Sequence, residues 1–113
     1  MNITEKKIDN ISVIAVSGRI DSTTSKDLET VLNQAIDTNS KIIVNLADTD
    51  YISSSGLRVL LAGLKKLRQK KGEMRLTSLQ PVVRDVFEIS GLSRLFSINK
   101  TLDAAVNSLQ AMQ

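Results

Sequence analysis

The sequence predicts a single α/β domain spanning residues 1–113, with a mixed, mostly parallel sheet of about five strands and about four helices. Runs rich in β-branched residues alternate along the chain with amphipathic segments of helical period, which implies right-handed crossovers between parallel strands. Two strand-like runs stand next to each other at the start, so the sheet is expected to begin with an antiparallel pair. A length of 113 residues suits one hydrophobic core.

The first two expected strands cover residues 2–7 and 11–18, separated by a turn at residues 9–10. The second run is dense in β-branched residues and ends at Gly18, which indicates a core strand closed by a glycine. The short spacing between the two runs predicts a hairpin.

A polar crossing over residues 19–25 leads into the first helix. The spacing from Thr24 to Asp27 resembles a capping box, and Asp21 or Ser22 could serve as the cap instead. The helix itself shows one apolar stripe: Leu28, Val31, Leu32, Ala35 and Ile36.

The chain is organised around residues 41–71, where an apolar run over 42–46 leads through an expected polar loop, residues 47–53, into a leucine-striped helix. Three serines and a glycine, residues 53–56, lie where the strand becomes the helix. Ligands and partners of open α/β sheets usually meet the protein at that end of the strands. The function is therefore expected at this turn.

The remaining elements follow in the same alternation. Residues 73–78 predict a fourth strand, and a short helix begins at Pro81 and ends near Gly91. A fifth strand is expected over residues 95–98, and Thr101 caps a last amphipathic helix.

The composition excludes several kinds of chemistry. The chain has no cysteine and no histidine, which excludes disulfides, thiolate or histidine metal sites and a Ser-His-Asp triad. We expect no catalytic residues, no metal and no cofactor. The first twenty residues are charged and lack a long apolar run, so no direct membrane insertion is expected and the cytoplasm is the default location.

Basic residues gather at the end of the central helix and just beyond it. A basic run can mark a nucleic-acid or membrane surface, but no aromatic platform accompanies this one. Cations near a helix C-terminus complement the helix dipole and face water, so no nucleic-acid partner is expected. The run consists of Lys65, Lys66, Arg68, Lys70, Lys71 and Arg75.

The central turn has two alternative interpretations, one as an enzyme and one as a phosphorylated receiver. A nucleophilic Ser54 or Ser55 would lack any histidine base. A receiver-like domain phosphorylated on Asp48 or Asp50 would need an acidic pair after an earlier strand, and that position offers only Asp21. Serine is also a preferred N-cap residue, so one of the three serines is expected to cap the helix.

Four segments of the chain together resemble the STAS domain, specifically the stand-alone bacterial anti-sigma factor antagonists. The resemblance covers nearly the whole chain, and its most specific parts are the serine-glycine-leucine turn and the later Phe-x-x-Ser-Gly-Leu. The matching segments are Gly18-x-Ile20-Asp21, Asn45-Leu46-x-Asp48, residues 51–61 and Val86-Phe87-x-x-Ser90-Gly91-Leu92.

The resemblance implies regulation by partner switching, without catalysis by this chain. An unmodified antagonist of that family binds an anti-sigma factor that is also a serine kinase, and so frees the sigma factor. The kinase phosphorylates the serine two positions before the glycine, which is Ser54 here, and a PP2C-type phosphatase reverses the modification. The residues then expected to contact the partner are Asp21, Ser22, Thr23, Ser53, Ser55, Gly56, Leu57 and Arg58.

Many family members have an aspartate before the acceptor, where this chain has Ser53. Some members with serine there belong to stressosome-like or transporter-associated systems. The alternative is therefore a STAS subunit that is not phosphorylated and docks on a membrane transporter or a stressosome-like scaffold.

Overall fold

The computed structural model describes residues 1–112 and contains one five-stranded sheet with the strand order β1-β2-β3-β4-β5. β1 and β2 are antiparallel, and every later neighbouring pair is parallel, which confirms the predicted sheet. The strands are β1 (Asn2–Ile8), β2 (Ile11–Ile20), β3 (Lys41–Ile52), β4 (Glu73–Thr77) and β5 (Ser97–Asn99).

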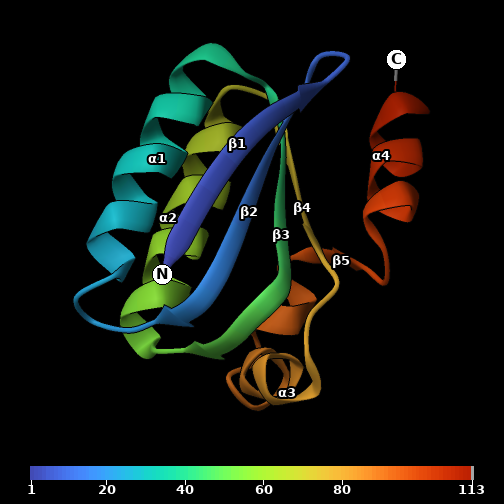
Figure 1. The fold of residues 1–113 in the computed structure, drawn as a ribbon. Coiled ribbons are helices and arrows are strands. Elements are labelled where there is room, and N and C mark those ends of the chain that lie inside the picture. Colours follow the sequence, from blue (N-terminus) through green and yellow to red (C-terminus); the bar gives the residue numbers. More distant parts are fainter. Residues whose placement is uncertain (113) are drawn as a thin grey trace.

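Four α-helices connect or follow the strands, in the predicted order. α1 and α2 lie side by side on one face of the sheet, α4 lies on the opposite face, and α3 lies beyond one end of the sheet (Figure 1). The helices are α1 (Ser25–Thr38), α2 (Ser54–Gln69), α3 (Pro81–Ile89) and α4 (Leu102–Gln110), with a 3₁₀ turn over Leu92–Arg94.

The core divides between the two faces of the sheet. The larger cluster lies between the sheet and α1, α2 and α3, and it includes the edge-to-face pair of Phe87 and Phe96, with ring centroids 5.5 Å apart. The smaller cluster, under α4, consists of Ile11, Val13, Ile43, Ala105 and Leu109. Apolar residues therefore alternate toward both faces of the central strands, as expected for a sheet covered on both sides.

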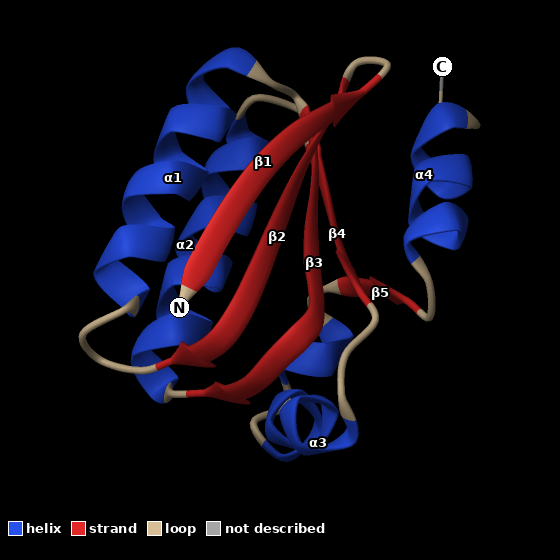
Figure 2. Cartoon of the chain, in the orientation of Figure 1, coloured by secondary structure: helices blue, strands red, loops and turns tan. Residues whose placement is uncertain are grey.

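Two strands extend further than the sequence predicts. The expected loop over residues 47–53 is wrong, because β3 continues to Ile52, and β2 continues past Gly18 to Ile20 (Figure 2). These extensions pair with each other beyond two register shifts, and the buried Thr49 hydroxyl donates to the Val16 carbonyl at 2.7 Å. The polar residues between Leu46 and Ile52 do not show an apolar strand pattern, although Ile20 and Ile52 at the paired ends are buried in the core. Gly18 has φ of +95°, which a glycine adopts without strain.

The fifth strand begins later than predicted. β5 is Ser97–Asn99 and not residues 95–98, because the 3₁₀ turn carries the chain to Leu95, and Phe96 is buried against Phe87. Among the helices of residues 1–112, none is long and apolar enough to cross a lipid bilayer.

Candidate functional site

The site is built where β2 and β3 end next to each other. Ile20 pairs with Ile52, and the Ser53 amide donates to the Ile20 carbonyl at 2.8 Å. Asp21 and Ser53 therefore leave neighbouring strands at the same edge of the sheet. This pairing brings the segments that follow β2 and β3 together.

The three serines of the β3–α2 turn have different positions. Ser53 is the N-cap of α2, and its hydroxyl accepts a hydrogen bond from the Gly56 amide at 3.2 Å. Ser54 is the first residue of α2 and is exposed, and Ser55 is half-buried. Within residues 1–112, neither the Ser54 nor the Ser55 hydroxyl makes a hydrogen bond. Ser54 is thus exposed and uncommitted, while Ser53 performs the expected capping.

Gly56 and Leu57 support the turn from inside. A Cβ on Gly56 would lie 2.6 Å from Ile20 Cγ2 and 2.8 Å from Ile52 Cγ1, which is too close for any other residue without rearrangement. Leu57 belongs to the core and is 8% exposed. Both were predicted as partner contacts, but neither is offered to solvent in this chain. Their buried positions anchor the start of α2 on the ends of β2 and β3.

The β2–α1 loop is held by a compact turn at Asp21. The Asp21 Oδ1 accepts from the amides of Thr23 and Thr24 at 3.0 and 2.9 Å, and the Asp21 amide donates to Thr24 Oγ1 at 2.8 Å. The proposed capping box from Thr24 to Asp27 is wrong, because the Thr24 side chain accepts no hydrogen bond from an amide of α1. The N-cap of α1 is Thr24, so the alternative that Asp21 caps the helix is also wrong. The Asp21 carboxylate instead holds the turn that precedes the helix, by accepting from the Thr23 and Thr24 amides.

These hydrogen bonds make the contribution of Asp21 to stability depend on pH. The hydrogen bond from the Thr24 amide is the main cause that lowers the pKa of Asp21 from its ordinary value of 3.8. A carboxyl whose pKa is lowered by folding stabilises the fold above its unfolded pKa, and this stabilisation is lost as the pH falls through the folded pKa.

Asp21→Ala is therefore expected to destabilise the protein at pH 7, with a penalty that shrinks as the pH falls below about 4. Urea unfolding of both proteins at a series of pH values measures the penalty. Asp27→Ala, at another acid near the start of α1, is the matched control. A penalty for Asp21→Ala that stays constant from pH 7 to pH 2 would contradict the conclusion that the charged carboxylate holds this turn.

A groove of about 370 Å³ separates the N-terminal ends of α1 and α2. Ser22 and Lys26 line it from the α1 side, and Ser55 and Arg58 line it from the α2 side. Of the eight predicted contact residues, all except Gly56 and Leu57 are exposed or half-buried. The structure therefore gathers residues 21–23, 53, 55 and 58 around one end of the molecule, next to Ser54.

The two acids of the receiver-like alternative lie on β3. Asp48 and Asp50 are exposed on the extended part of the strand. In the part of the chain that the structure describes, no three acidic side chains are grouped so as to hold a metal ion.

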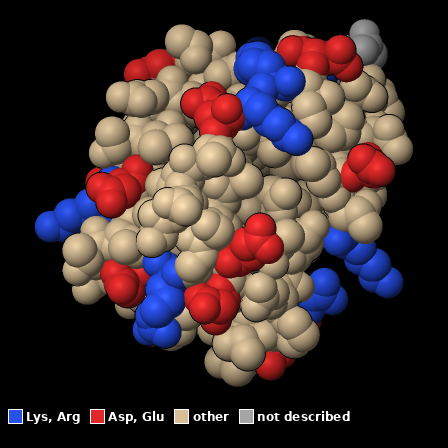
Figure 3. Space-filling view, viewed as in Figure 1, with Lys and Arg blue, Asp and Glu red and all other residues tan. Residues whose placement is uncertain are grey.

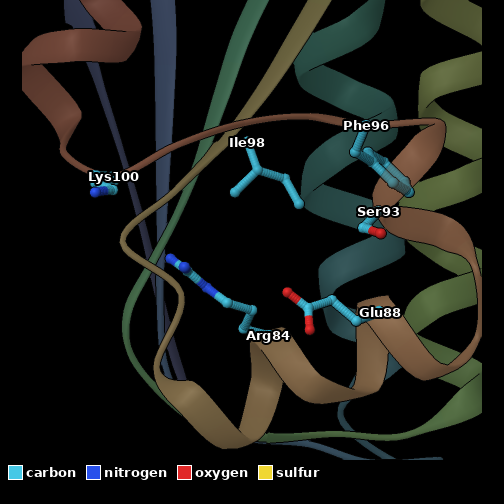
Figure 4. A pocket seen from close by; sticks show the side chains of 6 residues that line it. All are labelled: Arg84, Glu88, Ser93, Phe96, Ile98 and Lys100. Atoms are coloured by element: carbon cyan, nitrogen blue, oxygen red, sulfur yellow. The ribbon is translucent and has the colours of Figure 1, made fainter.

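A second cavity of about 370 Å³, which the sequence analysis did not find, lies beside α3 (Figure 4). Arg84 and Glu88 extend toward it from α3, and Phe96 and Ile98 line it from the β5 segment (Figure 4). Its lining residues fall within residues 84–100, and the bend of the chain from α3 through the 3₁₀ turn into β5 brings them around one hollow.

The basic residues of α2 are partly engaged within the fold. Lys66 donates to Asn33 of α1 at 2.9 Å, Arg68 donates to the Leu95 carbonyl at 3.0 Å, and Lys70 donates to the Ile36 carbonyl. On the face seen in Figure 3, acidic and basic side chains are interspersed. The basic run thus ties α2 to its neighbours.

The fold and site define a class of protein: a small α/β domain with an exposed serine hydroxyl at a strand-to-helix turn. The family model described as "STAS domain" matches residues 2–105. The chain is 40% identical to BtrV of Bordetella bronchiseptica, named as a candidate anti-sigma factor antagonist, over 93% of this chain and 91% of that protein.

Two further proteins have similar sequences. The anti-sigma F factor antagonist of Paenibacillus polymyxa is 30% identical over 91% of this chain and 87% of its own length. The solved structure of an anti-sigma factor antagonist from Mycobacterium paratuberculosis is 27% identical, has a TM-score of 0.89, and covers 96% of this chain and 93% of that one.

The chain belongs to the STAS domain family, and its relatives there are named anti-sigma factor antagonists. This confirms the resemblance carried by the serine-glycine-leucine turn and the later Phe-x-x-Ser-Gly-Leu.

Proposed function

We propose that the chain is an anti-sigma factor antagonist that binds an anti-sigma factor through the turn around Ser54. In this proposal, the unmodified protein holds the anti-sigma factor and so frees a sigma factor. The names of the relatives and the surface position of the turn support it. The cytoplasm, where transcription takes place, is the proposed location.

The switch that we propose is phosphorylation of Ser54 by the anti-sigma factor acting as a serine kinase with ATP, reversed by a PP2C-type phosphatase. The observation that carries this proposal is the difference among the three serines. Ser53 is committed to the cap, Ser55 faces the groove, and Ser54 is exposed with a free hydroxyl. A kinase therefore reaches Ser54 without unfolding the turn.

The position of Ser54 also makes its phosphorylated form compatible with the fold. A helix N-terminus carries free amides and the positive end of the helix dipole, so an anion there is stabilised. A phosphoryl group adds roughly −1.5 to −2 charges at neutral pH. A partner that fits the neutral turn would face an uncompensated, hydrated anion, and loss of about 3 kcal/mol of interface energy weakens binding roughly a hundredfold.

The proposal assigns no catalytic role to the chain itself. A serine nucleophile needs an adjacent base, and the Ser54 hydroxyl has no hydrogen-bond partner within residues 1–112. The sequence contains no histidine.

The proposal is tested by intact mass and site mapping after incubation of the protein with the host's own lysate and ATP. One phosphoryl group on Ser54 is expected, and Ser54→Ala is expected to abolish it. Ser55→Ala is the matched control and should still be modified. A protein that stays unmodified while a transporter or scaffold protein co-purifies with it would support the alternative of a non-phosphorylated docking subunit, and phosphate on Ser53 or Ser55 would contradict the choice of Ser54.

A further inference from the structure

Arg58 is a cation of the site that has no partner in the fold. It is exposed on α2 and lines the groove between α1 and α2. Among residues 1–112 the one ion pair joins Arg75 to Glu73, and Arg58 makes no side-chain hydrogen bond. Its guanidinium is therefore available to a group that arrives at the site.

Arg58 follows Ser54 by about one turn of α2. Residues four apart on a helix lie on the same face, with Cβ atoms about 5 to 6 Å apart. Helical side chains also lean toward the N-terminus, so a long side chain covers the turn that precedes its own Cα. From position 58 of α2, that turn is the one that begins at Ser54.

The groove carries an excess of positive charge. Lys26 and Arg58 line it, and Glu29 is its one acid within the described residues. Ser22 and Ser55 add neutral hydroxyl groups at its walls. This combination suits a carboxylate, because a guanidinium binds a carboxylate with two parallel hydrogen bonds.

We propose that Arg58 couples the state of Ser54 to partner binding. In the unmodified protein, Arg58 binds an acidic side chain of the anti-sigma factor at the groove. In the modified protein, the phosphoryl oxygens on Ser54 bind the Arg58 guanidinium instead. The partner then loses an ionic contact and also meets a new negative charge. The inference rests on the proposed function, but its first test needs neither the kinase nor the partner.

The first test measures the second pKa of a phosphoserine installed at position 54 of the full chain by ³¹P NMR. An opposite charge nearby lowers the pKa of an acid, so Arg58→Ala is expected to raise this value by about half a unit at low salt, and Arg58→Lys to raise it less. Lys65→Ala is the matched control, because Lys65 is an exposed cation of the same helix, about 16 Å from Ser54 along the helix axis. Its value should equal that of the unsubstituted protein.

The second test measures binding of the unmodified protein to the anti-sigma factor that co-purifies with it. Arg58→Glu is expected to weaken binding at least tenfold, while Lys65→Glu changes it less than threefold. Circular dichroism confirms that each variant is folded. Equal phosphoserine pKa values with and without Arg58 would overturn the proposal that the phosphoryl group binds the Arg58 guanidinium. Unchanged partner binding by Arg58→Glu would overturn the proposal that Arg58 binds an acidic side chain of the partner. Failure of the kinase to modify Ser54 would contradict the proposed function and leave the NMR result interpretable.

Discussion

Ser54→Asp is expected to weaken binding of the anti-sigma factor at least tenfold, whereas Ser54→Ala is expected to bind as the unsubstituted protein does. An aspartate places one permanent negative charge at an exposed position of the turn that we propose binds the partner. A tenfold change corresponds to about 1.4 kcal/mol, less than the effect of a phosphoryl group with its larger charge. Isothermal titration with the purified partner measures both constants.

A control substitution distinguishes a negative charge at Ser54 from a negative charge elsewhere on the surface. Ser97→Asp adds the same charge at an exposed serine of β5, at the opposite side of the sheet from β1. It should leave binding unchanged. The Ser54 hydroxyl makes no hydrogen bond, so Ser54→Ala should also leave the melting temperature within about two degrees. Equally tight binding by Ser54→Asp and Ser54→Ala would contradict the account based on charge repulsion.

Gly56→Val is expected to destabilise the fold by about 3 kcal/mol and to lower the melting temperature by ten degrees or more. The added carbon atoms would overlap Ile20 and Ile52, whose side chains are fixed at the paired ends of β2 and β3. Relief requires the first turn of α2 to move away from the sheet, which also displaces Ser54. Partner binding is therefore expected to weaken together with stability.

Ala62→Val is the matched control for this substitution. Ala62 is exposed on the same helix, so its replacement costs only the lower helix propensity of valine, about half a kcal/mol. Thermal unfolding followed by circular dichroism compares the two variants. A Gly56→Val protein that melts within two degrees of Ala62→Val would contradict the close packing of α2 on the strand ends.

The order of strands and helices could be predicted because each element has a clear hydrophobic period. The leucine stripe of α2 and the apolar run at the start of β3 are strong signals, and both are confirmed. The continuation of β3 through residues 47–52 could not be read in the same way. This part of β3 pairs with β2 beyond a register shift. The backbone hydrogen bonds of that pairing leave no pattern of polar and apolar residues in the sequence.

The position of the site could be predicted from the sequence, but the separate roles of its three serines could not. The serine-glycine-leucine turn identified the place, since strand ends and helix starts meet there. Which serine caps α2 depends on backbone geometry, and only the structure distinguishes Ser53 from Ser54. Gly56 was expected as a partner contact, and its spacing could not show that it packs against Ile20, which is distant in the sequence.

The groove shows the same limit of sequence reasoning. Ser22 and Arg58 both appeared among the expected contacts, but nothing in their spacing placed them across one hollow. Their proximity comes from the packing of α1 against α2 on one face of the sheet (Figure 1). Lys26, which shares this groove, was missed for the same reason.

The central claim is that an uncharged Ser54 permits docking and a phosphorylated Ser54 prevents it. The most direct measurement is the dissociation constant of one preparation for its anti-sigma factor before and after complete phosphorylation, with mass spectrometry confirming the site. We expect about a hundredfold weaker binding after modification, and full recovery after phosphatase treatment. The same dissociation constant in both states would contradict the claim.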